Sequence, residues 1–139
     1  MLNRFAAVAA ALTVAVVGAC TPRPQTPLVA TASVTVNSNE AKFQIVKCTQ
    51  VEWYRTIEIG GNFAGATVAV DERAEPVTVN SVRIRNLGGF TGMYSKGDGE
   101  GATTSLSSGK FSISGTAHGY AVDKPNEPAT APFKILVTC

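Results

Sequence analysis

Apolar and polar side chains alternate with a period of two along most of the chain after residue 32. In segment 42–48, for example, Phe43 and Ile45 are expected on one side of a strand, and Lys42 and Gln44 on the other. A period of two is typical of a β-strand with one buried face. The same alternation recurs in segments 56–61, 66–70, 77–85, 110–120 and 133–139.

Glycine and proline clusters separate these segments, and no stretch shows the period of a long amphipathic helix. About seven to nine short strands at this spacing predict an all-β fold, a single antiparallel β-sandwich-like domain. The predicted turns lie at 60–61, 71–76, 88–89, 97–101, 108–109 and 123–128.

The N-terminus has a different pattern. One cation, Arg4, is followed by the uncharged run 5–17 and then by Gly-Ala-Cys, which ends at Cys20. This pattern is typical of a secretory leader, and the run is too short for a permanent transmembrane helix, which needs about 20 residues. The ending resembles a bacterial lipobox, which implies a signal peptide over 1–19 and a diacylglyceryl group on the Cys20 thiol. The alternative is a secreted protein with a free cysteine near its terminus.

Acylation would hold the protein at the outer face of the cell membrane, since each buried acyl CH₂ contributes about 0.8 kcal/mol. We therefore expect an exported chain with an acylated tether at 20–32 and a β domain at 33–139. Pro22, Pro24 and Pro27 favour an extended spacer in the tether. Its threonines are either plain spacer residues or acceptors of sugars.

Charge and cysteine content exclude several classes of protein. The formal net charge is +2, and Arg83 and Arg85 are the only close basic pair in a strand-like segment. We therefore expect no nucleic-acid partner. Once Cys20 is acylated, Cys48 and Cys139 remain, and in an exported chain they are expected to form a disulfide. Its loop of about 90 residues would stabilise the fold by on the order of 4 kcal/mol.

Groups suited to catalysis or metal binding are sparse. His118 is the only histidine, and no G-x-S-x-G motif supplies a nucleophile for it and an aspartate such as Asp71, Asp98 or Asp123. One histidine and two cysteines do not make a zinc site. The loop 97–101 has too few oxygen ligands for calcium and lacks the Lys and Ser/Thr of a phosphate loop. We expect no enzyme activity, metal or cofactor, with His118 as a strand residue and 97–101 as a mobile hairpin loop.

Trp53 and Tyr54 form an aromatic pair between the polar residues Glu52 and Arg55 at a predicted strand start. Most such pairs pack in a core or over its edge. If they are exposed, they mark a contact surface for a sugar, a lipid or another partner. The pattern does not distinguish the two cases.

Five motifs carry a further likeness: KCT at 47–49, IEIGG at 57–61, YSKGDGEGA at 94–102, FSISGTAHG at 111–119 and PFKILVTC at 132–139. Together they resemble the mycobacterial 19-kDa lipoprotein antigen family. The resemblance implies a lipid-anchored envelope protein, a disulfide between Cys48 and Cys139, and recognition of the acylated N-terminus by host Toll-like receptors. It implies no settled activity for the folded domain. The short, proline-bearing tether differs from the typical one, so its glycosylation does not transfer.

Two functions from different classes fit these features. The first is a surface-exposed interaction or antigen module anchored by lipid, and the second is a carrier that encloses a lipid or glycolipid. A carrier needs an unfilled apolar cavity of hundreds of cubic ångströms. A domain of about 105 residues has little apolar volume to spare for one. We therefore favour the interaction module.

Overall fold

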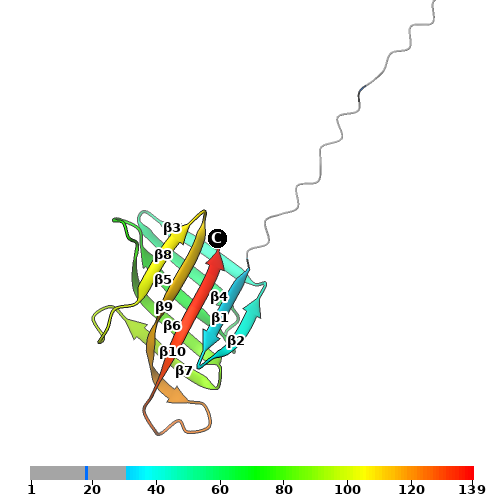
Figure 1. The fold of residues 1–139 in the computed structure, drawn as a ribbon. Coiled ribbons are helices and arrows are strands. Elements are labelled where there is room, and N and C mark those ends of the chain that lie inside the picture. The colour runs from blue at the N-terminus through cyan, green and yellow to red at the C-terminus, as the bar shows by residue number, and fades with distance from the viewer. Residues whose placement is uncertain (1–17, 19–30) are drawn as a thin grey trace, which may run out of the picture.

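Ten antiparallel strands in one sheet form the part of the chain that the computed structural model describes, which is residue 18 and residues 31–139 (Figure 1). The expectation of an all-β antiparallel fold is confirmed. The strands are β1 (Ala32–Val36), β2 (Asn39–Phe43), β3 (Val46–Val51), β4 (Tyr54–Gly60), β5 (Gly65–Asp71), β6 (Thr78–Leu87), β7 (Phe90–Ser95), β8 (Thr103–Ser107), β9 (Lys110–Ala121) and β10 (Ala129–Thr138).

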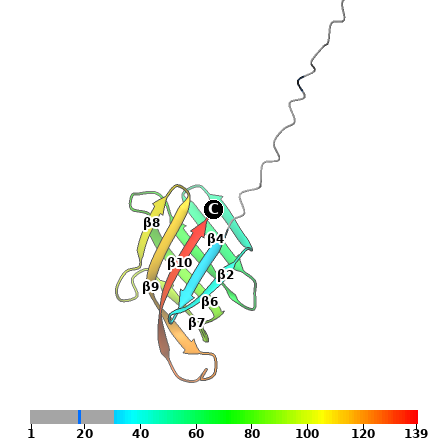
Figure 2. The same ribbon diagram turned by 45° about the vertical axis from the view of Figure 1, so that its right-hand side comes forward.

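The sheet is rolled until its two ends come close together. Hydrogen-bonded neighbours follow the order β2-β1-β10-β9-β7-β6-β5-β4-β3, and β8 pairs with β9 off this path. The strands β2 and β3 stand at opposite ends of the path, yet only Gln44 and Ile45 connect them. Since a residue spans at most about 3.6 Å, this link brings the ends of the sheet together. Figures 1 and 2 show β1, β9 and β10 in front of β4, β5 and β6.

The prediction of a sandwich is therefore corrected to one nearly closed sheet, with ten strands instead of seven to nine. The physical reason lies in β9, which pairs with β8 through Lys110–Ser114 and with β7 through His118–Ala121. Gly115 lies between these two paired stretches. By pairing with β7 at one end, β9 joins the strands β2, β1 and β10 to the strands from β7 to β3, so the two groups form one sheet. Alternation in the sequence predicts only which side of each strand is buried.

Three tight hairpin turns set the register of the sheet. Asn37-Ser38, Gly88-Gly89 and Ser108-Gly109 connect successive strands, and both residues of each pair have positive φ. Two-residue turns of this kind match the twist of antiparallel strands. At Gly88 a side chain would also collide with the chain, because a Cβ would lie 2.5 Å from the Val36 carbonyl oxygen. The turn at 37–38 lacks glycine and proline, so the sequence pattern missed it.

Segment 42–48 is not the single strand that its alternation predicted. The strand β2 ends at Phe43, β3 begins at Val46, and Ile45 is 72% exposed. The Ile45 carbonyl accepts a hydrogen bond from the Gly60 N–H at 2.9 Å. The segment passes from one end of the sheet to the other at Gln44 and Ile45, so the alternation of buried and exposed side chains is interrupted there.

The inward-facing side chains form one apolar core. Tyr94 also belongs to it, and its hydroxyl accepts a hydrogen bond from the Ala102 N–H at 3.0 Å. Burial of this apolar area is the main source of stability for the domain. The largest fully buried side chains are Phe90, Phe111, Ile57, Ile59, Ile84, Ile113, Ile135, Val34, Val36, Val68, Val70 and Val82.

A disulfide joins Cys48 in β3 to Cys139, which follows β10, as the sequence led us to expect. Their Cα atoms are 5.8 Å apart, and 91 positions separate them in the sequence. Around this bond, the Cys139 N–H donates to the Gly109 carbonyl and the Thr138 N–H donates to the Thr31 carbonyl, each at 3.2 Å. The disulfide therefore links β3, at one end of the strand path, to the C-terminus. The hydrogen bond from Thr138 connects the C-terminus to Thr31, just before β1.

Replacing both cysteines, Cys48→Ser with Cys139→Ser, should lower the free energy of unfolding by about 4 kcal/mol, because the unfolded chain gains loop entropy. Urea denaturation of the oxidised protein and the double variant measures the difference, and the reduced wild-type protein should match the variant. A loss below about 1 kcal/mol would contradict this, as would labelling of Cys48 and Cys139 in the unfolded, unreduced protein.

Candidate functional site: an aromatic hairpin and an arginine groove

The structure describes only some of the residues for which the sequence predicted a role. The lipidation residue Cys20, the signal peptide and most of the tether lie outside the described residues, so the anchor remains a prediction. Within residues 31–139, no cluster of three or more His, Cys, Asp or Glu side chains is placed to hold a metal ion. The same residues contain no helix with the length and hydropathy of a membrane span.

His118 is not assembled with an aspartate among the described residues. It lies on the outer face of β9, opposite Met93 on β7 and Thr130 on β10, and its side chain makes no hydrogen bond with a described residue. The Asp71 carboxylate is paired with Arg73 instead.

Loop 97–101 is an exposed turn, but it is not the hairpin that we expected. It lies between β7 and β8, and these strands do not pair with each other but with different parts of β9. The Asp98 N–H donates to the Ser95 carbonyl at 3.0 Å. The described residues give this loop no side chains that converge on a ligand.

The β3–β4 hairpin presents an exposed apolar surface. Val51, Trp53 and Tyr54, here called the aromatic tip, are 67%, 57% and 45% exposed. Positive φ at Glu52 allows the tight turn, and the Trp53 carbonyl accepts a hydrogen bond from the Glu72 N–H at 2.8 Å. The sequence left open whether Trp53 and Tyr54 pack in the core or are exposed. In the structure both side chains are exposed.

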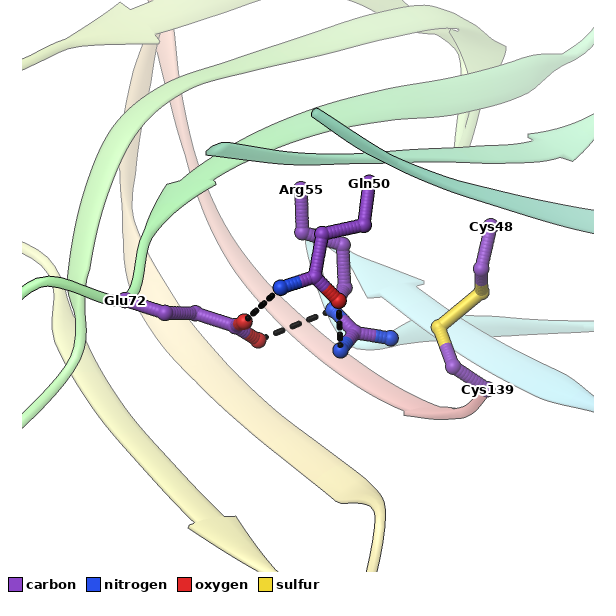
Figure 3. Close-up of a disulfide and its surroundings, with 5 residues drawn as sticks. All are labelled: Cys48, Gln50, Arg55, Glu72 and Cys139. Carbon is purple, nitrogen blue, oxygen red and sulfur yellow. Dashed lines mark hydrogen bonds and ion pairs between the residues drawn. A yellow bond between two sulfur atoms is a disulfide. The ribbon is translucent and has the colours of Figure 1, made fainter. Parts of the chain in front are cut away.

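A closed network of polar side chains supports the tip (Figure 3). Arg55 Nε donates to Glu72 Oε1 at 2.8 Å, Arg55 Nη2 donates to Gln50 Oε1 at 2.8 Å, and Gln50 Nε2 donates to Glu72 Oε2 at 3.1 Å. The Arg55 and Glu72 side chains are only 23% and 13% exposed. Partial burial strengthens such charge-assisted hydrogen bonds.

Two further contacts limit the motion of this network. The Arg55 guanidinium carbon lies 5.5 Å from the centre of the Phe111 ring, a cation–π distance. The disulfide lies beside the network in Figure 3. The hairpin is thus attached to β9 and to the C-terminus as well as to its neighbour β5. The sequence analysis did not predict this network, because its members Gln50 and Glu72 are 22 positions apart in the chain.

A second ion pair, between Asp71 and Arg73, lies against the ring of Tyr54. The Arg73 guanidinium binds both carboxylate oxygens of Asp71, and the backbone N–H of Arg73 also donates to Asp71 Oδ1 at 3.0 Å. The guanidinium carbon of Arg73 lies 5.4 Å from the centre of the Tyr54 ring. The side-chain hydrogen bonds from Arg73, followed by its backbone N–H, hold the pKa of Asp71 below its ordinary value of 3.8. The same pair raises the pKa of Arg73.

The outer face of the sheet is hollowed over β4–β7 and β9. Two adjoining hollows share Arg83, Arg85 and Met93, and together they form what we call the arginine groove. One half is lined by polar side chains that include Glu58 and Thr67, and the other by Tyr120 and two glycines. The alternation in segment 77–85 had placed Arg83 and Arg85 opposite the buried Val82 and Ile84, which is a signal for this surface.

The Asp71–Arg73 pair should make stability depend on pH. A carboxyl whose pKa is lowered on folding stabilises the folded state above its unfolded pKa, and this contribution is lost as the pH falls through the folded pKa. Asp71→Asn should therefore reduce the free energy of unfolding at pH 7 and reduce it progressively less below about pH 4. Denaturant titrations from pH 7 to about pH 2 measure this. The effect of Asp98→Asn, whose carboxylate has no partner among the described residues, should not vary in this way, and a pH-independent effect of Asp71→Asn would contradict the prediction.

Comparison with known proteins gives a consistent picture. The profile of the family described as Mycobacterium 19 kDa lipoprotein antigen matches residues 25–139. The chain is 58% identical over 139 residues, the full length of both, to a protein of Mycobacterium indicus pranii that carries only a general lipoprotein name. It is 35% identical over 95 residues, 68% of this chain and 58% of the relative, to the lipoprotein LpqH of Mycobacterium avium. It is 28% identical to the lipoprotein LppE of Mycobacterium tuberculosis over the full length of both. The chain belongs to the mycobacterial 19-kDa lipoprotein antigen family.

Proposed function

We propose that this lipoprotein is an interaction module on the outer face of the cell membrane and that it contacts a protein partner through the aromatic tip. The acyl groups on Cys20 hold it at the membrane, and no catalysis is part of the proposal. As the family resemblance implies, the acylated N-terminus is the part that a host Toll-like receptor recognises.

One observation supports this contact surface: an exposed tryptophan and an exposed tyrosine lie on a well-supported hairpin, and an exposed arginine from the segment after β5 packs against the tyrosine. Trp53 and Tyr54 project from the tip, and Arg73 packs over the Tyr54 ring. These three residue types dominate the energetics of protein–protein contacts. Since the network of Gln50, Arg55 and Glu72 already orders the hairpin, a partner would bind it with little loss of conformational entropy.

The alternative function of a lipid carrier receives less support. Both halves of the arginine groove open to the outside, and the inward positions of the strands belong to one packed apolar cluster. A carrier would hold an acyl chain among these inward side chains. In native mass spectrometry, an adduct of lipid mass on the folded domain would therefore favour the carrier over the interaction module.

The anchor is tested by Cys20→Ala. Without the thiol, the precursor should stay uncleaved or be mis-sorted and should carry no acyl chains, so any chain that has lost its apolar leader should leave the detergent phase in a detergent phase-partitioning experiment. Thr21→Ala, the neighbouring change, should leave cleavage and partitioning as in the wild type. A Cys20→Ala protein that is cleaved and still partitions into detergent would refute lipidation at this residue.

The tip is tested by a photoreactive side chain at position 53 in the lipidated protein on living mycobacteria. Cross-linking to a discrete protein partner is expected at position 53 and not at position 106, since Leu106 is also exposed but lies on β8. With the partner identified, Trp53→Ala should weaken binding at least about tenfold, and Leu106→Ala should leave it unchanged. Equal cross-linking at both positions, or none at position 53, would refute the proposed contact.

A further inference from the structure

Two arginines lie side by side on the outer face of β6, and neither forms an ion pair with a residue that the structure describes. Arg83 and Arg85 are two residues apart, so they share one face of the strand about 7 Å from each other. The side chain of Arg83 makes no hydrogen bond or ion pair with any residue that the structure describes. Two like charges at this distance repel each other, and an anion bound between them would relieve that repulsion.

One row of facing residues crosses the groove around them. The strand register aligns Glu58, Thr67, Arg83, Met93 and His118 across β4, β5, β6, β7 and β9. Glu58 is two strands away from Arg83, about 10 Å along this row, and forms no ion pair within the described residues. The charge of the groove is therefore positive at its centre.

Arg85 is already held in place for binding. Its Nη1 donates to Thr67 Oγ1 at 2.8 Å, and its Nε and Nη2 each donate to the Gly61 carbonyl at 3.3 Å. A guanidinium has five N–H donors, so Arg85 keeps two of them for a ligand. A fixed guanidinium loses little entropy when it binds a planar anionic group.

The two halves of the groove differ in character. The half beside Glu58 has a volume of about 480 Å³ and is lined by polar side chains, including Asn62 and Ser81. The other half, about 420 Å³, is mostly apolar and includes Tyr120. These volumes are in the range of small-molecule sites.

Glycines make the floor of the apolar half. Gly92 and Gly119 face each other in the register of β7 and β9. A Cβ on Gly119 would lie 2.0 Å from the Thr91 carbonyl oxygen, so the close approach of these strands requires glycine. Gly92 itself lies at an inward position of β7, since its Cβ would lie 2.6 Å from the buried Phe90 ring. On the outer face, only strand backbone therefore lies between the side chains of Met93 and Tyr120, which leaves room for a flat ring.

We propose that the arginine groove binds an anionic sugar, one that carries a carboxylate or a phosphate. The free guanidinium of Arg83 and the fixed one of Arg85 bind the anionic oxygens with charge-assisted hydrogen bonds. The polar side chains of the first half bind hydroxyl groups. Tyr120 and Met93 contact the apolar face of the sugar ring. A nucleic acid fits less well, because its affinity depends on many phosphate contacts and the groove offers two cations.

The structure offers a site-specific probe in Met93. It is the only methionine besides Met1, and it belongs to both halves of the groove. The lipidated protein, labelled with ¹³C in its methionine methyl groups and held in uncharged nanodiscs, should show a Met93 resonance that shifts when ligand binds; Met93→Leu assigns it. The probes are trigalacturonate against neutral galactotriose, mannose 6-phosphate against mannose, and inorganic phosphate.

At least one anionic sugar should shift the Met93 resonance with a Kd below about 1 mM and bind at least about tenfold more tightly than its neutral counterpart. Whichever of the two binds tells whether the groove prefers a carboxylate or a phosphate. Arg83→Gln should weaken this binding at least about tenfold, and Lys134→Gln, which removes the same charge from an exposed position on β10, should not. Tyr120→Ala should weaken binding of the sugar without changing that of inorganic phosphate.

Three results would overturn the proposal. The first is the absence of any shift with both anionic sugars. The second is equal weakening by Arg83→Gln and Lys134→Gln, which would indicate general attraction to a positive protein. The third is inorganic phosphate binding as tightly as the phosphorylated sugar, which would make the sugar ring irrelevant. None of these results bears on the aromatic tip, so this inference and the proposed function fail independently.

Discussion

Closure of the rolled sheet depends on two connections between strands that are not hydrogen-bonded neighbours. Gln44 and Ile45 link β2 directly to β3, although these strands stand at opposite ends of the strand path. The disulfide then ties Cys48 of β3 to Cys139 after β10. A short link and a covalent bond together hold an edge strand where no backbone ladder does, and an edge strand held in this way is less available for pairing with another molecule.

The aromatic tip depends on this closure. Its hairpin consists of the edge strand β3 and its neighbour β4, and β3 has a hydrogen-bonded neighbour on one side only, so the disulfide and the link from β2 hold its other side. Arg55 reaches across the roll to Phe111 on β9, and Glu72 joins the hairpin to the segment after β5. The exposed apolar surface is therefore carried by a fixed part of the fold, which is the condition for a preorganised contact.

The arginine groove is fixed by a different means. It lies on the outer face of the middle strands of the path, where the register aligns side chains from five strands, and the backbones of β7 and β9 at Gly92 and Gly119 form part of its floor. The two surfaces thus differ in chemistry as well as in place. One offers aromatic rings for a protein partner, and the other offers guanidinium groups and a polar lining for a charged sugar.

The sequence by itself determined the all-β class, most of the turns and the cysteine pair, because alternation, glycine clusters and cysteine count are local or compositional signals. It also predicted the lipoprotein character through the leader. Only the tertiary structure decided that the strands form one rolled sheet, that Trp53 and Tyr54 are exposed, and that Gln50, Arg55 and Glu72 meet. These features depend on which strands pair across long sequence distances, and a period of two gives the buried side of a strand without naming its neighbours.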